Sequence, residues 1–285
     1  MGSPLATLTA SDVEGFERDG YVVVRQAFPR ADALEMQARW WAELELLHRI
    51  RRDDRATWRQ PASDLKAAKR DPIQAGILSP RVRGVFDDLL GKDAFEPPKD
   101  WGRTIVTFPE PPGEPPNSNW DVPTWFWHWD NPAWLHLDRP TALFVVSFIG
   151  EVAPRSGGAL LLSGSPRLLL QQERRRPVSE PRDPAGKPWF ALYRSHPWLM
   201  ALAGEAPSPT DRVAAFMDQE TVVDGVPLRV VELTGQPGDM VFCHPCMVHC
   251  GAPNRGSQPR FMRIKQQVFS REGRERFMAL HRPDA

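Results

Sequence analysis

The sequence of 285 residues lacks an excess of charge of either sign, because 36 Lys and Arg residues balance 36 Asp and Glu residues. A balanced chain carries no general attraction to nucleic acid or to an anionic membrane. It also has no apolar run near the roughly 20 residues that a membrane-spanning helix needs. Its first residues lack the basic and apolar regions of a secretion signal, so we expect a cytoplasmic protein.

Cysteine is scarce as well, and the three cysteines all lie in one segment, VFCHPCMVHCGAPN, at residues 241–254. An odd number in one short segment does not make a disulfide framework. Cys243 and Cys246 form a C-x-x-C pair before Cys250, but a structural zinc site normally takes two spaced pairs of ligands. A redox dithiol normally opens a helix in a βαβ unit, which this segment does not resemble. We therefore expect three small, buried hydrophobic side chains.

Proline and tryptophan, in contrast, are plentiful, with 30 and 11 residues. So many prolines favour loops and sheet edges over a helical bundle. Five of the tryptophans fall between residues 120 and 134, which indicates either a Trp-rich core or an aromatic-walled pocket. The candidates for a substrate pocket are Trp127, Trp129 and Trp134, which would suit an apolar or ring-bearing ligand.

The first hundred residues show mixed helical and strand patterns. A capping box at residues 11–14 predicts a short helix, and the β-branched run 21–24 predicts a strand behind it. Helical periodicity extends over about 31–52. A further helix is predicted between Ser79, followed by proline, and Gly91.

After residue 101, short β-rich runs alternate with Gly and Pro turns, which is the pattern of an antiparallel barrel or sandwich. The expected strands are 104–108, 125–129, 142–149, 159–162, 228–233, 240–243 and 261–269. One long segment, about 171–218, interrupts them and is rich first in Arg and Pro and later in aromatic residues. Because plain loops of this length are uncommon in compact domains, we expect a lid-like insertion.

A metal site is indicated by WHWD, which contains His128 and Asp130. On a strand, residues two apart share a face, so these two side chains would point the same way. With a distant histidine such as His249 they would form a 2-His-1-carboxylate set, which binds Fe(II) and leaves positions open for other ligands. An isolated H-x-D is a weak signal, since His136 and Asp138 form a second one.

The chain contains four segments that carry a resemblance, DVEGFERDGYVVVRQAF, WHWD, SFIGEVAPRSGGALLLSGSPR and GDMVFCHPCMVHCGAPNRGSQPR. Their order and spacing resemble the phytanoyl-CoA dioxygenase family of Fe(II)/2-oxoglutarate-dependent oxygenases. The resemblance implies a mainly β fold with flanking helices, a double-stranded β-helix or cupin-like jelly roll. The expected domain is then 1–285, with helical support at about 10–100 and a jelly-roll core at about 101–270.

The resemblance assigns His128, Asp130 and His249 to iron. Family members place the H-x-D about thirty residues before a turn glycine, here Gly157, and this spacing favours the first H-x-D over the second. They also place an asparagine five residues after the distal histidine, which favours His249 over His244.

The resemblance assigns Arg260 to the distal carboxylate of 2-oxoglutarate, with Arg255 and Arg263 as nearby rivals. A guanidinium meets a buried carboxylate with two parallel hydrogen bonds and stays charged. The implied reaction consumes 2-oxoglutarate and O₂, releases succinate and CO₂, and by default hydroxylates a C–H bond of a small organic molecule. Two departures from the family pattern, Pro166 and Gly251, remove no metal ligand.

Two other classes of function stay open at this point. One is a cupin-like metal-dependent enzyme without 2-oxoglutarate chemistry, and the other is a non-catalytic relative that acts as a binding module. Omission of 2-oxoglutarate tests the first, and iron titration tests the second. We expect a small-molecule substrate, no nucleic-acid or membrane partner, and a monomer or homodimer. Desaturation, epimerisation and cyclisation are alternative outcomes that the sequence does not separate from hydroxylation.

Overall fold

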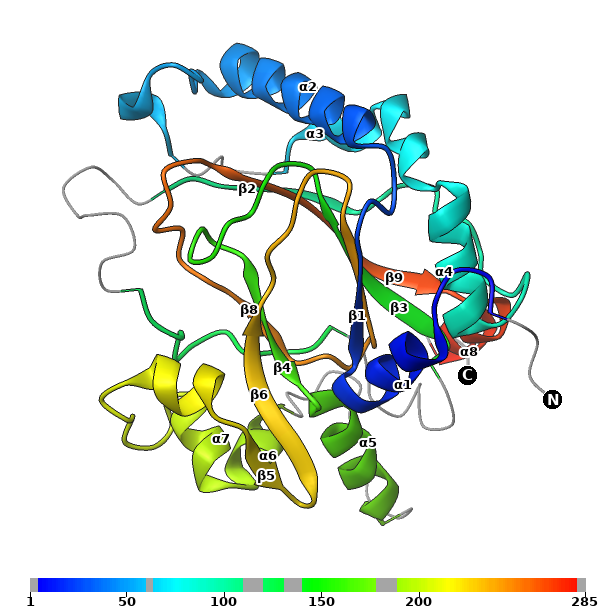
Figure 1. Cartoon of the computed structure of the whole chain (residues 1–285), viewed down its shortest axis with the longest axis vertical. Helices are drawn as coiled ribbons and strands as arrows, with labels where there is room; N and C mark the ends of the chain where they lie inside the picture. Colours follow the sequence, from blue (N-terminus) through cyan, green and yellow to red (C-terminus); the bar gives the residue numbers. More distant parts are fainter. Residues whose placement is uncertain (1–4, 60–63, 110–119, 131–139, 178–188, 281–285) are drawn as a thin grey trace.

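Two antiparallel sheets form the centre of the structure, a computed structural model that describes residues 5–59, 64–109, 120–130, 140–177 and 189–280. Within these ranges, one sheet has the strand order β1-β7-β3-β9-β2 and the other has the order β5-β6-β4-β8. The two sheets lie face to face, as Figure 1 shows. This arrangement confirms the expected mainly β, jelly-roll class of fold.

The strand bounds follow the β-rich runs of the sequence closely. The first sheet contains β1 (Tyr21–Val24), β2 (Arg103–Thr107), β3 (Ala142–Phe148), β7 (Met240–Cys243) and β9 (Arg260–Phe269). The second contains β4 (Ala159–Ser163), β5 (Thr221–Val223), β6 (Val226–Glu232) and β8 (His249–Gly251). The very short strands β5 and β8 were not predicted, because three residues carry almost no periodicity.

Strand β3 shows how the sheets divide the core into layers. Its seven residues are all buried, so it reads as a continuous apolar run with no polar face. Phe144 and Val146 point into the space between the sheets, where they pack with Met262 of β9. Leu143 and Val145 point to the other side, toward the helices. Side chains of β3 are therefore buried on both faces of the five-stranded sheet.

A first helical layer covers the outer face of the five-stranded sheet (Figure 1). It contains α1 (Ala10–Asp19), α2 (Arg30–His48), α3 (Lys66–Arg70) and α4 (Pro80–Leu90), with α8 (Arg271–Leu280) at the end of the described chain. Aromatic contacts fasten this layer to the sheet. The ring of Trp41 lies 5.3 Å from that of Phe261 on β9, and Phe86 of α4 lies 5.4 Å from Phe242 on β7.

A second layer lies beside the four-stranded sheet and comes from the long interrupting segment (Figure 1). It contains α5 (Ser165–Arg175), α6 (Trp189–Arg194), α7 (Pro197–Leu202) and a π-helical turn (Ala214–Asp218). Leu199 and Phe216 are fully buried against residues of β4 and β6. Within the described ranges, no helix is long and apolar enough to cross a membrane.

Two local predictions need correction. The capping box of α1 is formed by Thr9 and Asp12, so the helix begins slightly earlier than residues 11–14 suggest. The strand predicted over 125–129 is wrong, because only His128 makes a β-bridge there. Phe126 has a left-handed backbone with φ of 63°, which no extended strand tolerates.

Candidate metal centre and co-substrate pocket

The two candidate histidines are brought together by a backbone bridge. The amide of His128 donates to the carbonyl of His249 at 3.0 Å, and the amide of His249 donates back at 2.8 Å. These two hydrogen bonds join the segment 120–130 to β8. Asp130 lies two residues after His128 in the same segment. One ligand atom from each of these three side chains lies within 4.8 Å of the other two, and no other group of this kind occurs among the described residues.

Each histidine ring is oriented by a hydrogen bond to the backbone. The Nδ1 atom of His128 lies 2.8 Å from the carbonyl of Phe126, and the Nδ1 atom of His249 lies 2.9 Å from the carbonyl of Met247. A carbonyl only accepts, so each Nδ1 carries the proton and each Nε2 keeps its lone pair. This is the usual arrangement of histidines that bind a metal through Nε2.

The distances fit a single ion. Nε2 of His128 lies 3.8 Å from Oδ1 of Asp130, and Nε2 of His249 lies 3.7 Å from Oδ2. Two atoms that each bind one metal ion at about 2.0–2.2 Å are at most about 4.4 Å apart. The residues therefore fit a 2-His-1-carboxylate centre, the set that holds Fe(II) in non-haem oxygenases.

Burial keeps His249 in the form that binds metal. It lowers the pKa of His249, and the nearby Asp130 carboxylate only partly offsets this. The imidazole is therefore neutral at neutral pH. Its ring stacks on Phe144 of β3, with centroids 4.8 Å apart and planes 19° from parallel. Phe144 was not identified from the sequence as part of the site.

Gln266 is a further contact of the site that sequence reasoning missed. Its Nε2 donates to Oδ1 of Asp130 at 2.9 Å. The residue lies where the pairing of β3 with β9 shifts register between Leu143 and Val145, so that β9 carries one extra residue opposite Phe144. Such bulges redirect side chains near active sites. Because alternate residues of a strand share a face, the series Arg260, Met262, Ile264 along β9 would have predicted that Gln266 also points between the sheets.

Arg260 lies on the face of β9 that points between the sheets. Its neighbour two residues on, Met262, belongs to the inter-sheet core. One guanidinium nitrogen of Arg260 contacts the hydroxyl of Thr107, its partner in the β2–β9 register. Burial lowers the pKa of Arg260 to about 10, so the side chain stays cationic at neutral pH.

A cavity of about 610 Å³ opens at Arg260. Its other lining residues are Thr107, Asp121, Val122, Pro123, Thr124, Trp125, Arg212, Gly251, Ala252 and Pro253. Gly251 is two residues from His249 on β8, so the cavity extends from Arg260 to the strand that carries this candidate ligand. Nε of Arg260 is buried and has no hydrogen-bond partner among the described residues.

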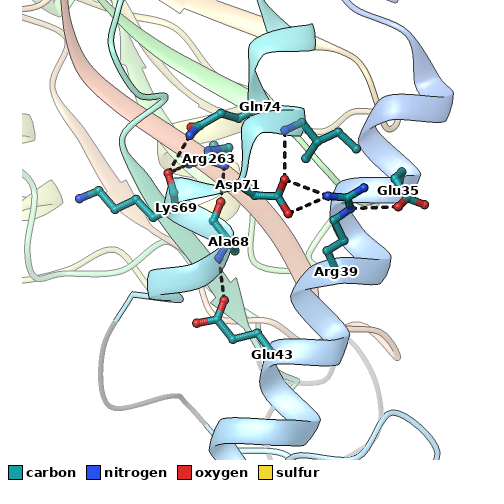
Figure 2. Close-up of polar contacts among 9 residues, drawn as sticks. Glu35, Arg39, Glu43, Ala68, Lys69, Asp71, Gln74 and Arg263 are labelled. Carbon is teal, nitrogen blue, oxygen red and sulfur yellow. Dashed lines mark hydrogen bonds and ion pairs between the residues drawn. The ribbon is translucent and has the colours of Figure 1, made fainter.

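The rival Arg263 points toward Ala68 and Lys69 of α3, as Figure 2 shows. Its guanidinium donates to the carbonyls of Ala68 and Lys69 in α3, at 3.2 and 3.4 Å, and lies over the ring of Trp40. It therefore joins the sheet to the outer helices and does not reach the cavity. The other rival, Arg255, is likewise outside the cavity lining.

Two of the three tryptophans expected at a substrate pocket are buried. Trp127 and Trp129 are 3% and 4% exposed and belong to the core beside the four-stranded sheet. Trp134 lies outside the described residues. The tryptophan that lines the cavity is Trp125. The reason is the irregular backbone at Phe126, since strict alternation would have placed the three tryptophans 125, 127 and 129 on one face.

The segment that carries His128 is fastened to the second helical layer by Arg212. The guanidinium donates to the carbonyls of Val122 and Pro123 at 2.7 and 3.1 Å, and to the carbonyls of Ala201 and Leu202, both at 2.9 Å. The interrupting segment thus helps to position His128. Sequence reasoning gave Arg212 no role, because its partners are not local.

The cysteines are free and buried, as expected. Cys243, Cys246 and Cys250 are at most 1% exposed. Burial raises the pKa of each thiol, which disfavours the thiolate that a metal or a redox reaction needs. The cysteine side chains therefore act as core residues.

Comparison with known proteins gives the same class of fold. The sequence profile of the family described as phytanoyl-CoA dioxygenase (PhyH) matches residues 16–262. No curated protein matches the chain significantly. The non-heme alpha ketoglutarate dependent carbocyclase SnoK from nogalamycin biosynthesis is 15% identical, with a TM-score of 0.52 over 95% of this chain and 87% of that chain. This likeness shows the fold.

Two further solved structures are similar at lower scores. EctD from S. alaskensis with bound Fe is 18% identical, with a TM-score of 0.49 over 92% of this chain and 76% of that chain. HygX from Streptomyces hygroscopicus with nickel and 2-oxoglutarate bound is 15% identical, with a TM-score of 0.49 over 93% of this chain and 87% of that chain.

Proposed function

Because the chain belongs to the phytanoyl-CoA dioxygenase family, we propose that it hydroxylates a C–H bond of a small organic molecule at an iron held by His128, Asp130 and His249. The protein is an Fe(II)- and 2-oxoglutarate-dependent oxygenase. Beyond the family membership, we propose which residues bind the iron, which residue binds 2-oxoglutarate, and what the reaction does to the substrate.

The chain's own residues have distinct roles in this proposal. Nε2 of His128, Nε2 of His249 and a carboxylate oxygen of Asp130 would hold the ion. The backbone carbonyls that accept from the two Nδ1 atoms fix the ring orientations. When bound, Fe(II) supplies open positions for 2-oxoglutarate and O₂, and so the oxidising chemistry.

One observation carries the proposal most strongly, namely the cationic Arg260 buried in the same cavity wall as β8. A buried charge is costly unless it is paired. No carboxylate among the described residues shifts the pKa of Arg260, which is lowered by burial alone. An anionic co-substrate would supply the missing partner. This favours 2-oxoglutarate chemistry over a cupin-like enzyme without it, and over a non-catalytic binding module.

The remaining parts of the proposal concern the setting of the reaction. We propose a cytoplasmic protein, monomeric or homodimeric, with no nucleic-acid or membrane partner. We also propose that the segment at about 171–218 is an insertion that borders the substrate entrance. The contacts of Arg212 with Val122 and Pro123, which line the cavity, support this placement.

The test is anaerobic Fe(II) titration followed by measurement of succinate release from 2-oxoglutarate in air. The wild type should bind one Fe(II) per chain and turn over 2-oxoglutarate slowly without substrate. His128→Ala, Asp130→Ala and His249→Ala should each abolish turnover, because three ligands are the minimum for this centre. His48→Ala, at the distant end of α2, is the matched control. Normal turnover in any one ligand variant would refute the assignment.

A further inference from the structure

Trp125 and Phe126 are two neighbouring aromatic side chains that are exposed. They are 69% and 65% exposed, whereas most other tryptophans and phenylalanines among the described residues are buried. The two rings are neighbours, with centroids 5.9 Å apart and planes tilted by 49°. Exposed aromatic surface that is contiguous often marks a site of contact with another molecule.

The aromatic pair, Trp125 with Phe126, lies between the metal ligands and the co-substrate cavity. The ring of Phe126 lies 4.5 Å from the ring of His128, and the carbonyl of Phe126 accepts the hydrogen bond from that histidine. Trp125 lines the cavity that also contains Arg260. A molecule that covers the pair would therefore lie next to both the metal centre and the co-substrate.

The pair is held in an unfavourable backbone conformation. Phe126 has φ of 63°, a left-handed conformation that a bulky aromatic residue rarely adopts. The chain before it is fixed, since Arg212 donates to the carbonyls of Val122 and Pro123. The indole of Trp127 also donates to the carbonyl of Pro123, at 2.9 Å. Strained residues that the surrounding structure holds in place occur preferentially at functional sites.

The chemistry of the lining restricts the ligand class. Arg212 uses its donors on protein carbonyls and a serine hydroxyl, and Arg260 is assigned to the co-substrate. Around Trp125, the remaining lining is apolar at Val122, Pro123, Ala252 and Pro253 and polar at Thr107, Asp121 and Thr124, and the carboxylate of Asp121 disfavours an anionic ligand. Aromatic rings favour offset or edge-to-face contact with another ring. The surface thus suits a flat, mainly uncharged ring system better than a charged or flexible ligand.

We propose that Trp125 and Phe126 form the substrate-binding surface and that the substrate carries a flat apolar ring system, an inference that rests on the proposed function. If the substrate covers the aromatic pair during turnover, this explains why the two side chains are exposed, why the backbone of Phe126 is strained, and why the pair lies beside His128. The hydroxylated carbon would then lie at the edge of a ring system or on a substituent of it.

The test uses 2-naphthol as the ring-bearing probe and 1-octanol as an acyclic probe. Saturation-transfer NMR measures probe binding to the full chain loaded with Mn(II) and 2-oxoglutarate without O₂. Paramagnetic broadening by Mn(II) then reports whether the bound probe is near the metal. We expect 2-naphthol to bind, to be broadened, and to bind more tightly than 1-octanol.

Variants assign the binding to the pair. Trp125→Ala and Phe126→Asn should each weaken 2-naphthol binding roughly tenfold, as for loss of a central aromatic contact. Asparagine tolerates the left-handed backbone, so the second variant keeps the chain path. Both should keep the circular dichroism spectrum and the unfolding midpoint of the wild type, which shows that they are folded. Leu47→Ala, which removes a distant side chain that is 62% exposed, should leave probe binding unchanged.

The outcomes separate this inference from the proposed function. If wild-type protein binds neither Mn(II) nor 2-oxoglutarate, the proposed function fails. If it binds both, the inference alone fails when 2-naphthol does not bind, is not broadened, or binds both variants as tightly as the wild type. The inference also fails if sedimentation shows a dimer that Trp125→Ala dissociates, because the pair would then be a contact between two copies.

Discussion

Replacement of Gln266 by leucine should weaken metal binding although Gln266 is not a ligand. Its amide donates to Oδ1 of Asp130 at 2.9 Å, and so holds the carboxylate in one orientation. Leucine has a similar size but no donor. Without the hydrogen bond the carboxylate can rotate, and part of that freedom must be lost again each time a metal ion binds.

The exposure of Gln266 sets the size of the effect. A hydrogen bond to a charged group contributes about 1.5–3 kcal/mol when its loss leaves a buried group unsatisfied. Gln266 is exposed, so water can replace part of the lost contact. We therefore expect the lower end, about 1.5 kcal/mol, which corresponds to slightly more than tenfold in the dissociation constant. Changes in residues that orient metal ligands typically cost 10–100-fold.

The assay is anaerobic titration with Mn(II), in which the EPR signal of the free ion gives the dissociation constant. Gln267→Leu is the matched control, because it makes the same change at the next position of the bulge. Its dissociation constant should stay within about twofold of the wild type. An equal loss in both variants would indicate that disturbance of the bulge is responsible, and an unchanged affinity in Gln266→Leu would refute the orienting role.

Four further outcomes are expected. Arg260→Ala should raise the 2-oxoglutarate dissociation constant by about a hundredfold or more while metal binding survives, since breaking a buried ion pair costs about 3–5 kcal/mol. Arg260→Lys should restore part of the affinity. A similar loss in the control Arg255→Ala would contradict the assignment. Replacement of all three cysteines by serine should leave iron content unchanged, as metal analysis would show. Burial lowers the pKa of His244 from 6.5 to about 3, so between these pH values the unfolded chain binds a proton that the folded chain does not. Urea unfolding should therefore show that the free energy of unfolding falls as the pH drops through this range, by up to about 1.4 kcal/mol per pH unit from this group. His244→Leu should lose that contribution. Limited proteolysis should cut first near Arg174–Arg176, and 2-oxoglutarate with a substrate should slow the cut; first cleavage in the N-terminal helices would argue against a lid.

Predictions from local sequence patterns agreed well with the structure. The strand over 142–149 was recognisable because its residues are almost all apolar, as in a strand that is buried on both faces. The observed β3 is Ala142–Phe148. The helix between Ser79 and Gly91 was recognisable because its cap and its stop are both local signals, and the structure shows the serine side chain accepting from Val82. These features depend on neighbours within one turn or one strand.

Features that depend on distant contacts could not be predicted in this way. The irregular chain at 122–129 is held by Arg212, which donates to Val122, and by Tyr193, which donates to Trp127, and both donors lie in a segment that looked like an insertion. The contact of Gln266 with Asp130 joins residues 136 positions apart, so no local pattern indicates it. The family resemblance indicated Arg260, but the contacts of its rival Arg263 with the carbonyls of Ala68 and Lys69 could not be predicted, because they join residues 195 and 194 positions apart.

The buried contact of Arg263 has a consequence for how the protein unfolds. Helix α3 has only five residues, too few for a helix to be stable in isolation. Glu43 of α2 accepts from the amides of Ala67 and Ala68 at 3.0 and 2.7 Å, while Arg263 of β9 donates to the carbonyls of Ala68 and Lys69 (Figure 2). Departure of α3 would leave the charges of Glu43 and Arg263 buried and less well satisfied. Helix and sheet are thus bound into one cooperative unit, and the amide hydrogens of α3 should exchange with solvent only as fast as those of β9.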